Sequence, residues 1–239
     1  MVSIAGSKKL KRQMAPQFWG IARKDKRFII TTRPGPHKKN YAIPTAVFLR
    51  DTLKIVSSLR EAKASIYSGK VKIDGVVRKS LHHAIGLMDV IELENVSDIY
   101  RLVPTEGKIL KPIKITDAEK SKKLVRIVTK TTINKGKTQT GFHDGRSTLA
   151  EVNGKVGDTC VMQIPDQKVL EIIKLEAGCQ GLVTRGVNAG QIGKVESVEE
   201  GTFILPKRVI LILGDRKIEI PADVIMPIGK EEPVIQLKW

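Results

Sequence analysis

The chain has 239 residues, of which 42 are Lys or Arg and 25 are Asp or Glu, and its formal net charge is +17 at pH 7. Hydrophobic residues make up 41% of it but aromatic residues only 4%, so it can bury small aliphatic cores yet lacks the aromatic side chains of a base-stacking platform for single strands. At this length, two or three small domains are more common than one.

The positive charge is concentrated in two segments. Residues 1–40 contain eleven Lys or Arg and one acid, and residues 108–147 contain eleven against three, whereas the rest of the chain is close to neutral. Concentrated cations indicate a polyanionic partner, because Lys and Arg that neutralise phosphates release counterions and so gain affinity. The sequence therefore predicts RNA or DNA as the first partner to consider.

Residues 1–42 are predicted to be a basic extension without regular structure. Pro16 and the Pro-Gly-Pro run at 34–36 prevent a continuous helix. The segment has too few apolar residues to fold alone, so we expect it to become ordered only against a partner that neutralises it. A solvated, disordered tail is the alternative, although Phe18 and Trp19 give the extension something to pack with.

Two short helices are predicted next. Pro44 suits the first position of a helix, and apolar residues at helical spacing follow it. A second helix should span residues 59–67. Ser58 followed three residues later by Glu61 is a capping-box pattern, and Gly69 provides the C-terminal stop.

A small sheet should follow these helices. Residues 71–73 alternate apolar and basic side chains, Asp74-Gly75 is a hairpin turn pair, and residues 76–77 form the return strand. Residues 89–93 predict another strand. The order of these elements resembles the alpha-L RNA-binding module, except that two residues separate Gly86 from the Asp that usually follows the glycine directly. The resemblance implies an RNA-contacting face made by Arg50, Arg60, Lys63, Lys70 and Lys72, although cations on such faces are often simply solvated.

The segment from residue 107 to residue 172 is predicted to be a central β domain, with strands at 124–129 and 139–142 separated by tight turns. His143 and Asp144 are adjacent, which suggests acid–base chemistry. However, neighbours on a strand point to opposite faces, and no nucleophile motif accompanies them. We interpret His143, like the pair at 82–83, as a structural or surface histidine.

Residues 173–239 are predicted to be β-rich. Within them, residues 181–195 alternate apolar side chains, contain Arg185 followed by glycine, and close with glycines at 190 and 193. This pattern resembles the KOW motif of SH3-like barrels. A P-loop is not indicated, because no Lys-Ser/Thr pair or long helix follows. The glycines either form the turns of a small barrel or allow a close approach to RNA.

Cys160 and Cys179 have no cysteine or histidine neighbours at metal-ligand spacing, so they are expected to be reduced and partly buried. We predict no metal and no cofactor. The N-terminus lacks the apolar run of a secretory signal, and no stretch is apolar enough to cross a bilayer. The expected location is the cytoplasm.

Seven motifs occur in this order in the chain: Lys8–Arg12, Ala15–Trp19, Arg33–Lys38, Phe48–Asp51, Gly86–Ile91, His143–Arg146 and the KOW segment. Through these motifs, nearly the whole chain resembles the small-subunit ribosomal protein four family of archaea and eukaryotes. Its end at Trp239 resembles the archaeal members more than the eukaryotic ones. The resemblance implies a basic extension, an alpha-L module, a central β domain and a KOW-bearing barrel, all bound to small-subunit ribosomal RNA.

We therefore predict an α+β, multidomain fold with a basic N-terminal extension (1–42), an alpha-L RNA-binding domain with helix-turn-helix and small sheet (43–106), a central β domain (107–172), and a KOW SH3-like barrel with a C-terminal tail (173–239). The predicted function is that of a non-enzymatic constituent of the small ribosomal subunit, which binds ribosomal RNA and neighbouring ribosomal proteins but no membrane or small-molecule substrate. The alternatives are an RNA-modifying enzyme or a transcription factor with the same modules.

The side chains predicted to contact RNA are basic and lie mostly in the extension. They are Lys8, Lys9, Lys11, Arg12, Arg23, Lys24, Lys26, Arg27, Arg33, His37, Lys38, Lys39, Arg50, Arg60, Lys63, Lys70, Lys72, Lys135, Lys137, His143, Arg146 and Arg185.

Overall fold

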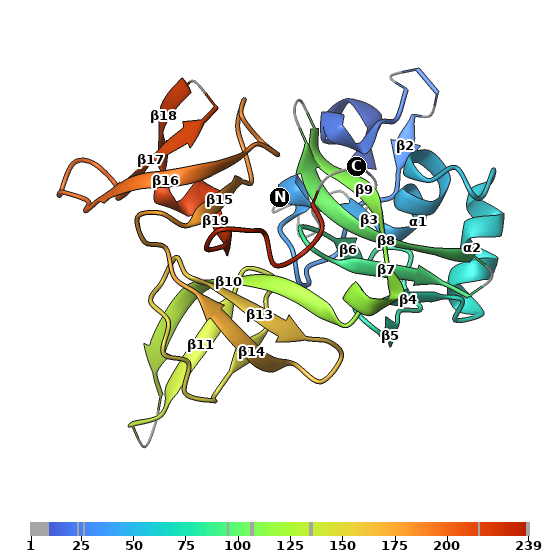
Figure 1. Ribbon diagram of the computed structural model, residues 1–239. Coiled ribbons are helices and arrows are strands. Elements are labelled where there is room, and N and C mark those ends of the chain that lie inside the picture. Colours follow the sequence, from blue (N-terminus) through green and yellow to red (C-terminus); the bar gives the residue numbers. More distant parts are fainter. Residues whose placement is uncertain are drawn as a thin grey trace, which may run out of the picture.

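The computed structural model describes residues 10–22, 24–25, 27–94, 96–105, 108–133, 136–214 and 216–237. Three five-stranded antiparallel sheets make up most of it, and the described helices are few and short. Figure 1 shows the sheets as three lobes, with the N-terminal extension beside the lobe of the first sheet. Within the described part of the chain, no helix is long and apolar enough to cross a membrane.

The described part of the extension packs on the protein itself. Trp19 is only 1% exposed and donates a hydrogen bond from Nε1 to the carbonyl oxygen of Ala42 at 2.8 Å. Leu10 and Ile21 belong to the same hydrophobic core as Trp19, together with helix residues of the first lobe. The expectation that the extension needs a partner to become ordered is therefore wrong for these residues, because its apolar side chains find a core within the chain. Its elements are β1 (Leu10–Lys11), which pairs with β2 (Phe28–Ile29), and 3-10 turns at Arg12–Met14, Gln17–Trp19 and Lys39–Tyr41.

The second predicted helix is confirmed, and the first is shorter than expected. Helix α2 spans Leu59–Tyr67, and the Ser58 hydroxyl accepts a hydrogen bond from the backbone amide of Glu61 at 3.2 Å. The Glu61 carboxylate reaches back to Ser57. Pro44 lies just before the first helix. That helix is α1 (Thr45–Val47), which continues into a π-helical turn (Phe48–Thr52), and β3 (Ile43–Pro44) pairs with β6 (Ala84–Ile85) beside it.

The first sheet has the strand order β5-β4-β7-β8-β9. Asp74 and Gly75 both take positive φ values, 51° and 74°, so the predicted two-residue hairpin is present with the primed turn that Asp-Gly favours. β9 pairs with β8, so this sheet extends past the boundary expected at residue 106. The strands are β4 (Val71–Ile73), β5 (Val76–Val77), β7 (Val90–Leu93), β8 (Val96–Thr105) and β9 (Lys108–Ile115).

The central sheet has the strand order β12-β11-β10-β13-β14, and it contains both strands predicted for this segment. A 3-10 turn, Asp117–Glu119, connects it to the first sheet. The strands are β10 (Lys122–Thr132), β11 (Thr138–Phe142), β12 (Ser147–Thr148), β13 (Thr159–Gln163) and β14 (Lys168–Ile173).

The C-terminal sheet has the strand order β18-β17-β16-β15-β19, so its last strand returns to pair with its first. The following tail lies between the lobes in Figure 1. There Ile235 and Leu237 are buried in a core that also contains Ile99, Val161 and Met226, one residue from each of the three sheets. The strands are β15 (Gln180–Val183), β16 (Ile192–Glu199), β17 (Arg208–Leu213), β18 (Arg216–Pro221) and β19 (Ile225–Gly229), with a 3-10 turn at Ala222–Val224.

Gly190 joins the C-terminal sheet to the first sheet. Its φ is +85°, and a Cβ at this position would lie 2.7 Å from the carbonyl oxygen of Pro104 and 2.7 Å from Cα of Thr105, both backbone atoms at the end of β8. We expect Gly190→Ala to lower the free energy of unfolding by about 1–2 kcal/mol through left-handed backbone strain, and by about 1–3 kcal/mol more through overpacking. Urea denaturation measures the sum.

Gly186→Ala is the matched control for this prediction. Gly186 has a similar φ of +97°, but no atom lies within 4 Å of the Cβ it would gain. The control should therefore show the strain alone. Equal losses of stability in the two variants would mean that the loop at Gly190 does not need its close approach to β8.

Candidate nucleic-acid interface

Polar side chains from five segments of the chain meet at a buried cluster where the extension, the first sheet and the central sheet join. We name it the junction cluster. Its carboxylates are almost fully buried, and the Lys123 side chain is 1% exposed. Its members are His37, Asp74, Asp89, Lys123, Asp144 and Arg146.

Lys123 is the centre of the junction cluster. Its Nζ lies 2.6 Å from Oδ2 of Asp74, 2.6 Å from Oδ1 of Asp89 and 3.2 Å from Oδ2 of Asp144. Arg146 adds a second cation, with Nη2 at 2.8 Å from the same Asp74 oxygen. One ammonium thus neutralises carboxylates from two sheets, which fixes their relative position.

The Asp89 carboxylate has two further partners besides Lys123. His37 Nε2 lies 3.0 Å from Oδ2, and the backbone amide of Gly86 donates to the same oxygen at 2.8 Å. A Cβ on Gly86 would lie 2.4 Å from the His37 ring, so only glycine allows the ring this close. The two extra residues before Asp89 are accommodated because Met88 adopts a left-handed conformation, with φ +63°.

The charges on Asp89 and Lys123 are held in place by their neighbours in the cluster. Burial opposes ionisation of Asp89, but His37 and Lys123 outweigh it and hold the Asp89 pKa below its usual range. Burial likewise opposes the charge on Lys123, and the carboxylates of Asp89, Asp74 and Asp144 overcome it and raise the Lys123 pKa. Burial raises the pKa of Asp74, and the nearby Lys123 and Arg146 offset this only in part. The charge is thus held most firmly on Asp89 and Lys123.

His143 lies beside the cluster as a neutral ring. Its Nδ1 accepts a hydrogen bond from the backbone amide of Arg126 at 3.1 Å, so the proton is on Nε2, which faces the carbonyl oxygen of Leu87 at 3.3 Å. Burial lowers the His143 pKa to about 4. The interpretation of His143 as a structural histidine fits this geometry.

We expect His143 to make the protein less stable as the pH falls from about 6.5 to about 4. In this window the unfolded chain binds a proton at this histidine and the folded chain does not, so stability is lost on acidification, by up to about 3 kcal/mol. His143→Asn, whose amide oxygen can still accept from Arg126, should show a pH dependence of the unfolding free energy that is shallower by about one proton. An unchanged pH dependence would contradict the assignment.

Most of the described side chains that the sequence predicted to contact RNA are exposed. They lie on the extension, on α2, around β4 and at the β10–β11 turn. The exposed ones are Lys11, Lys24, Arg27, Arg33, Lys38, Lys39, Arg60, Lys63, Lys70, Lys72 and Lys137, and Arg185 is partly exposed.

Other predicted contacts are occupied inside the chain. His37 and Arg146 belong to the junction cluster, and His143 lies beside it. Arg50 is 9% exposed and pairs with Asp51 at 2.6 Å, and Arg12 donates from Nε to the carbonyl oxygen of Ile21 at 2.9 Å. The sequence could not distinguish these five from free surface cations, and we leave them out of the proposed interface. The predicted residues Lys8, Lys9, Arg23, Lys26 and Lys135 lie outside the described residues.

The structure adds a cavity of about 980 Å³ between the extension, the central sheet and the C-terminal sheet, which we name the basic groove. No sequence pattern indicated two of its members, Tyr41 and Arg126, because a lone tyrosine and a cation within a strand pattern are common in any chain. Its polar lining includes Arg33, Lys38, Lys39, Tyr41, Arg126 and Arg185.

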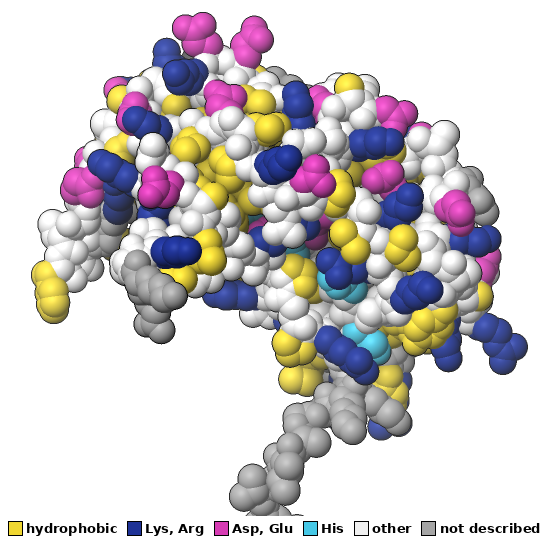
Figure 2. All heavy atoms as spheres, turned by 90° about the horizontal axis from the view of Figure 1, so that it is seen from below, with side chains coloured by type: hydrophobic (Ala, Val, Ile, Leu, Met, Phe, Trp, Pro, Cys, Tyr) yellow, Lys and Arg dark blue, Asp and Glu magenta, His cyan; other side chains and the backbone are white. Residues whose placement is uncertain are grey.

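The space-filling view shows how charge is distributed on one face. In the upper part of Figure 2, Lys and Arg alternate with Asp and Glu, whereas Lys and Arg dominate the lower part, where histidine side chains lie beside them. Among the described residues, no group of three or more His, Cys, Asp and Glu is arranged to hold a metal ion, since a lysine occupies the centre of the carboxylate cluster. The excess of Lys and Arg on the lower part of this face suits binding of a polyanion.

Comparison with known proteins decides the family. Residues 96–169 match the model of ribosomal family S4e, and residues 5–40 match the RS4NT domain. The small ribosomal subunit protein eS4 of Staphylothermus marinus is 37% identical, over 99% of this chain and 98% of its own length. The chain belongs to the ribosomal S4e family. The eS4 protein of Methanothermobacter thermautotrophicus, with the same identity and coverage, agrees with this assignment.

A solved structure of an S4e protein supports the same family assignment. The crystal structure of the 30S ribosomal protein S4e from Thermoplasma acidophilum is 30% identical, covers 80% of this chain and 97% of its own, and superimposes with a TM-score of 0.68. Three motifs that carried the family resemblance in the sequence, around His37, Asp89 and Asp144, meet in the junction cluster. In this S4e chain they are thus joined by one network of contacts inside the protein.

Proposed function

We propose that this chain is a structural constituent of the small ribosomal subunit, where it binds ribosomal RNA and neighbouring ribosomal proteins. As a member of the S4e family it is a ribosomal protein and not an enzyme, and it acts in translation, in the cytoplasm, as part of the ribosome. Its RNA contacts are the exposed cations of the extension, α2 and β4. They act on phosphates and on RNA shape.

One observation carries the RNA-binding part of this proposal: the described part of the extension folds back so that Leu10, Trp19 and Ile21 are buried, while most of its described Lys and Arg side chains remain exposed. Arg33, Lys38 and Lys39 are exposed, and none of them forms a salt bridge with an acid among the described residues. Cations held unpaired on a rigid surface can neutralise phosphates without first breaking contacts within the protein.

Two finer assignments belong to this proposal. The pair of helices α1 and α2 with the first sheet corresponds to an alpha-L RNA-binding module, and the C-terminal sheet with Gly190 in its β15–β16 loop corresponds to a KOW SH3-like barrel. In the proposed division, the extension comprises residues 1–42 and the barrel begins near residue 173. The loop at Gly190 packs on β8, so the RNA contact proposed for the barrel is limited to Arg185.

Sedimentation of a cell lysate in moderate salt tests the proposal. The chain, detected with an antibody, should migrate with the small ribosomal particle. When removal of magnesium unfolds the particle, both the chain and the RNA should leave the position of the intact particle in the gradient. A chain that stays at the top of the gradient under conditions that keep other small-subunit proteins bound would contradict it.

A further inference from the structure

The basic groove combines an apolar floor with a cationic rim. Its volume of about 980 Å³ is at the upper end of the range for small-molecule sites, so it has room for a nucleotide with its flanking phosphates. Side chains from β10, β11 and β19 and from two connecting loops make the floor. They are Leu87, Val128, Phe142, Val156 and Met226.

The rim of the groove is cationic. Arg33, Lys38 and Lys39 line it from the extension, and Arg126 and Arg185 line it from the two sheets opposite. These last two are fixed in place. Arg126 donates from Nη2 to the carbonyl oxygen of Ala222 at 3.1 Å, and Arg185 lies 3.3 Å from the Asp223 carboxylate. Asp223 is the one acid among the described lining residues, so the rim keeps an excess of positive charge.

Tyr41 gives the groove an aromatic surface. The Arg185 guanidinium lies over its ring, with Cζ at 5.0 Å from the ring centroid, and Tyr41 is still 38% exposed. Unstacked bases of RNA are typically recognised by stacking on aromatic rings and on arginine planes. The groove thus offers a stacking surface, an apolar floor and phosphate-binding cations within one cavity.

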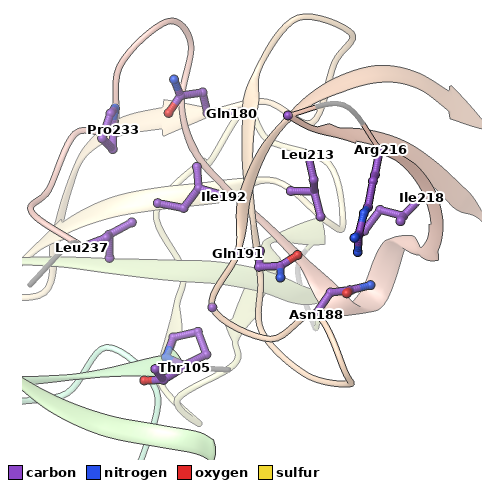
Figure 3. Close-up of a pocket in the computed structure, with 13 residues that line it drawn as sticks. Thr105, Gln180, Asn188, Gln191, Ile192, Leu213, Arg216, Ile218, Pro233 and Leu237 are labelled. Carbon is purple, nitrogen blue, oxygen red and sulfur yellow. The ribbon is translucent and has the colours of Figure 1, made fainter. Parts of the chain in front are cut away.

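Another cavity lacks this combination. It measures about 770 Å³ and lies between the end of β8 and the C-terminal sheet. Figure 3 shows Ile192, Leu213 and Leu237 around it, with amide side chains and Arg216, its one cation among the described residues, at its edge. A polyanion has little to bind there, so the inference concerns the basic groove alone.

We propose that the basic groove binds one unstacked nucleotide of the small-subunit ribosomal RNA, with the base on the apolar floor beside Tyr41 and the flanking phosphates on Arg33, Lys38, Lys39, Arg126 and Arg185. This inference rests on the proposed function. It adds that the protein recognises a base that is unstacked from an RNA helix, in addition to backbone phosphates. The binding site lies where the extension, the central sheet and the C-terminal sheet meet.

Val156→Trp tests this proposal by filling the groove without removing a cation. Val156 is 55% exposed, so the larger side chain is compatible with folding. Binding to small-subunit ribosomal RNA should weaken at least about tenfold at every salt concentration, whereas the slope of log affinity against log salt should stay that of wild type, because every phosphate-binding cation is retained. Val128→Trp, at a position that is 46% exposed, is a second filling variant.

Leu170→Trp is the matched control. Leu170 lies on β14 of the central sheet, the sheet that also contains Val128; it is 54% exposed and does not line the groove, so the affinity of this variant for RNA should remain within about twofold of wild type. Thermal unfolding of all variants shows whether each is folded. Folded Val156→Trp and Val128→Trp proteins with wild-type affinity would overturn the proposal.

Two further outcomes are distinguishable. A wild-type protein without salt-dependent affinity for ribosomal RNA would refute the proposed function itself. Nucleoside monophosphates added at millimolar concentration should compete weakly, because they supply one phosphate. Tight binding of a free nucleotide that leaves RNA binding unchanged would overturn the assignment of the groove to RNA.

Discussion

Lys123→Met is expected to lower the free energy of unfolding by about 3–5 kcal/mol, because it leaves buried carboxylates without the cation that they share. Asp74 and Asp89 each lie 2.6 Å from the Lys123 ammonium, and Asp144 lies at 3.2 Å. After the substitution, Arg146 is the one Lys or Arg left in the cluster, and the buried carboxylates repel one another. Methionine keeps the length and apolar volume of the lysine stem, so the loss reports the charge.

Urea denaturation near neutral pH measures this loss. Lys122→Met is the control, because Lys122 is the exposed neighbour on the same strand and its substitution removes the same formal charge. The control should stay within about 0.5 kcal/mol of wild type. A Lys123→Met protein as stable as the control would mean that the cluster does not hold the sheets together.

The second large effect is expected from neutralising the rim of the extension. The triple substitution of Arg33, Lys38 and Lys39 by Gln should make the slope of log affinity against log salt shallower by about 2, at about 0.7 for each phosphate that is no longer neutralised. All three side chains are exposed, so the fold should be unaffected. Filter binding to small-subunit ribosomal RNA across a series of salt concentrations gives the slope.

A control with the same net charge separates local contacts from general electrostatics. Lys168, Lys194 and Lys230 are exposed and lie outside the basic segments, so their triple substitution by Gln should leave the slope near that of wild type. Equal changes in both triple variants would show that only total charge matters. Deleting residues 1–40 is a poorer test, because it also removes Trp19 and other core side chains.

The features that the sequence predicts correctly are local. The Ser58 cap of α2 and the Asp74-Gly75 hairpin depend on residues within a few positions of one another, and both are present. The strands predicted at residues 124–129 and 139–142 are present for the same reason, as β10 and β11. The packing of the extension could not be predicted in this way, because its apolar side chains contact the core around Phe48, and local sequence patterns do not reveal such a distant contact.

The junction cluster could not be predicted, because its contacts span large separations in the sequence. Lys123 resembles any other cation of a basic block, and only the pairing of β10 with the rest of the structure directs it to Asp74, 49 residues earlier. His37 is predicted to contact phosphate for the same reason, although its ring faces Asp89, 52 residues later. The motif that contains His37 can be recognised in the sequence, but its contact cannot.

The junction cluster also bears on how the chain folds as it is synthesised. Asp74 and Asp89 are made before Lys123 and Arg146, so a nascent chain that ends after the first sheet has carboxylates without their cations. Those groups stay hydrated until the central sheet is complete, and the first lobe cannot close fully before then. The final packing around Asp74 thus waits for a lysine translated 49 codons later.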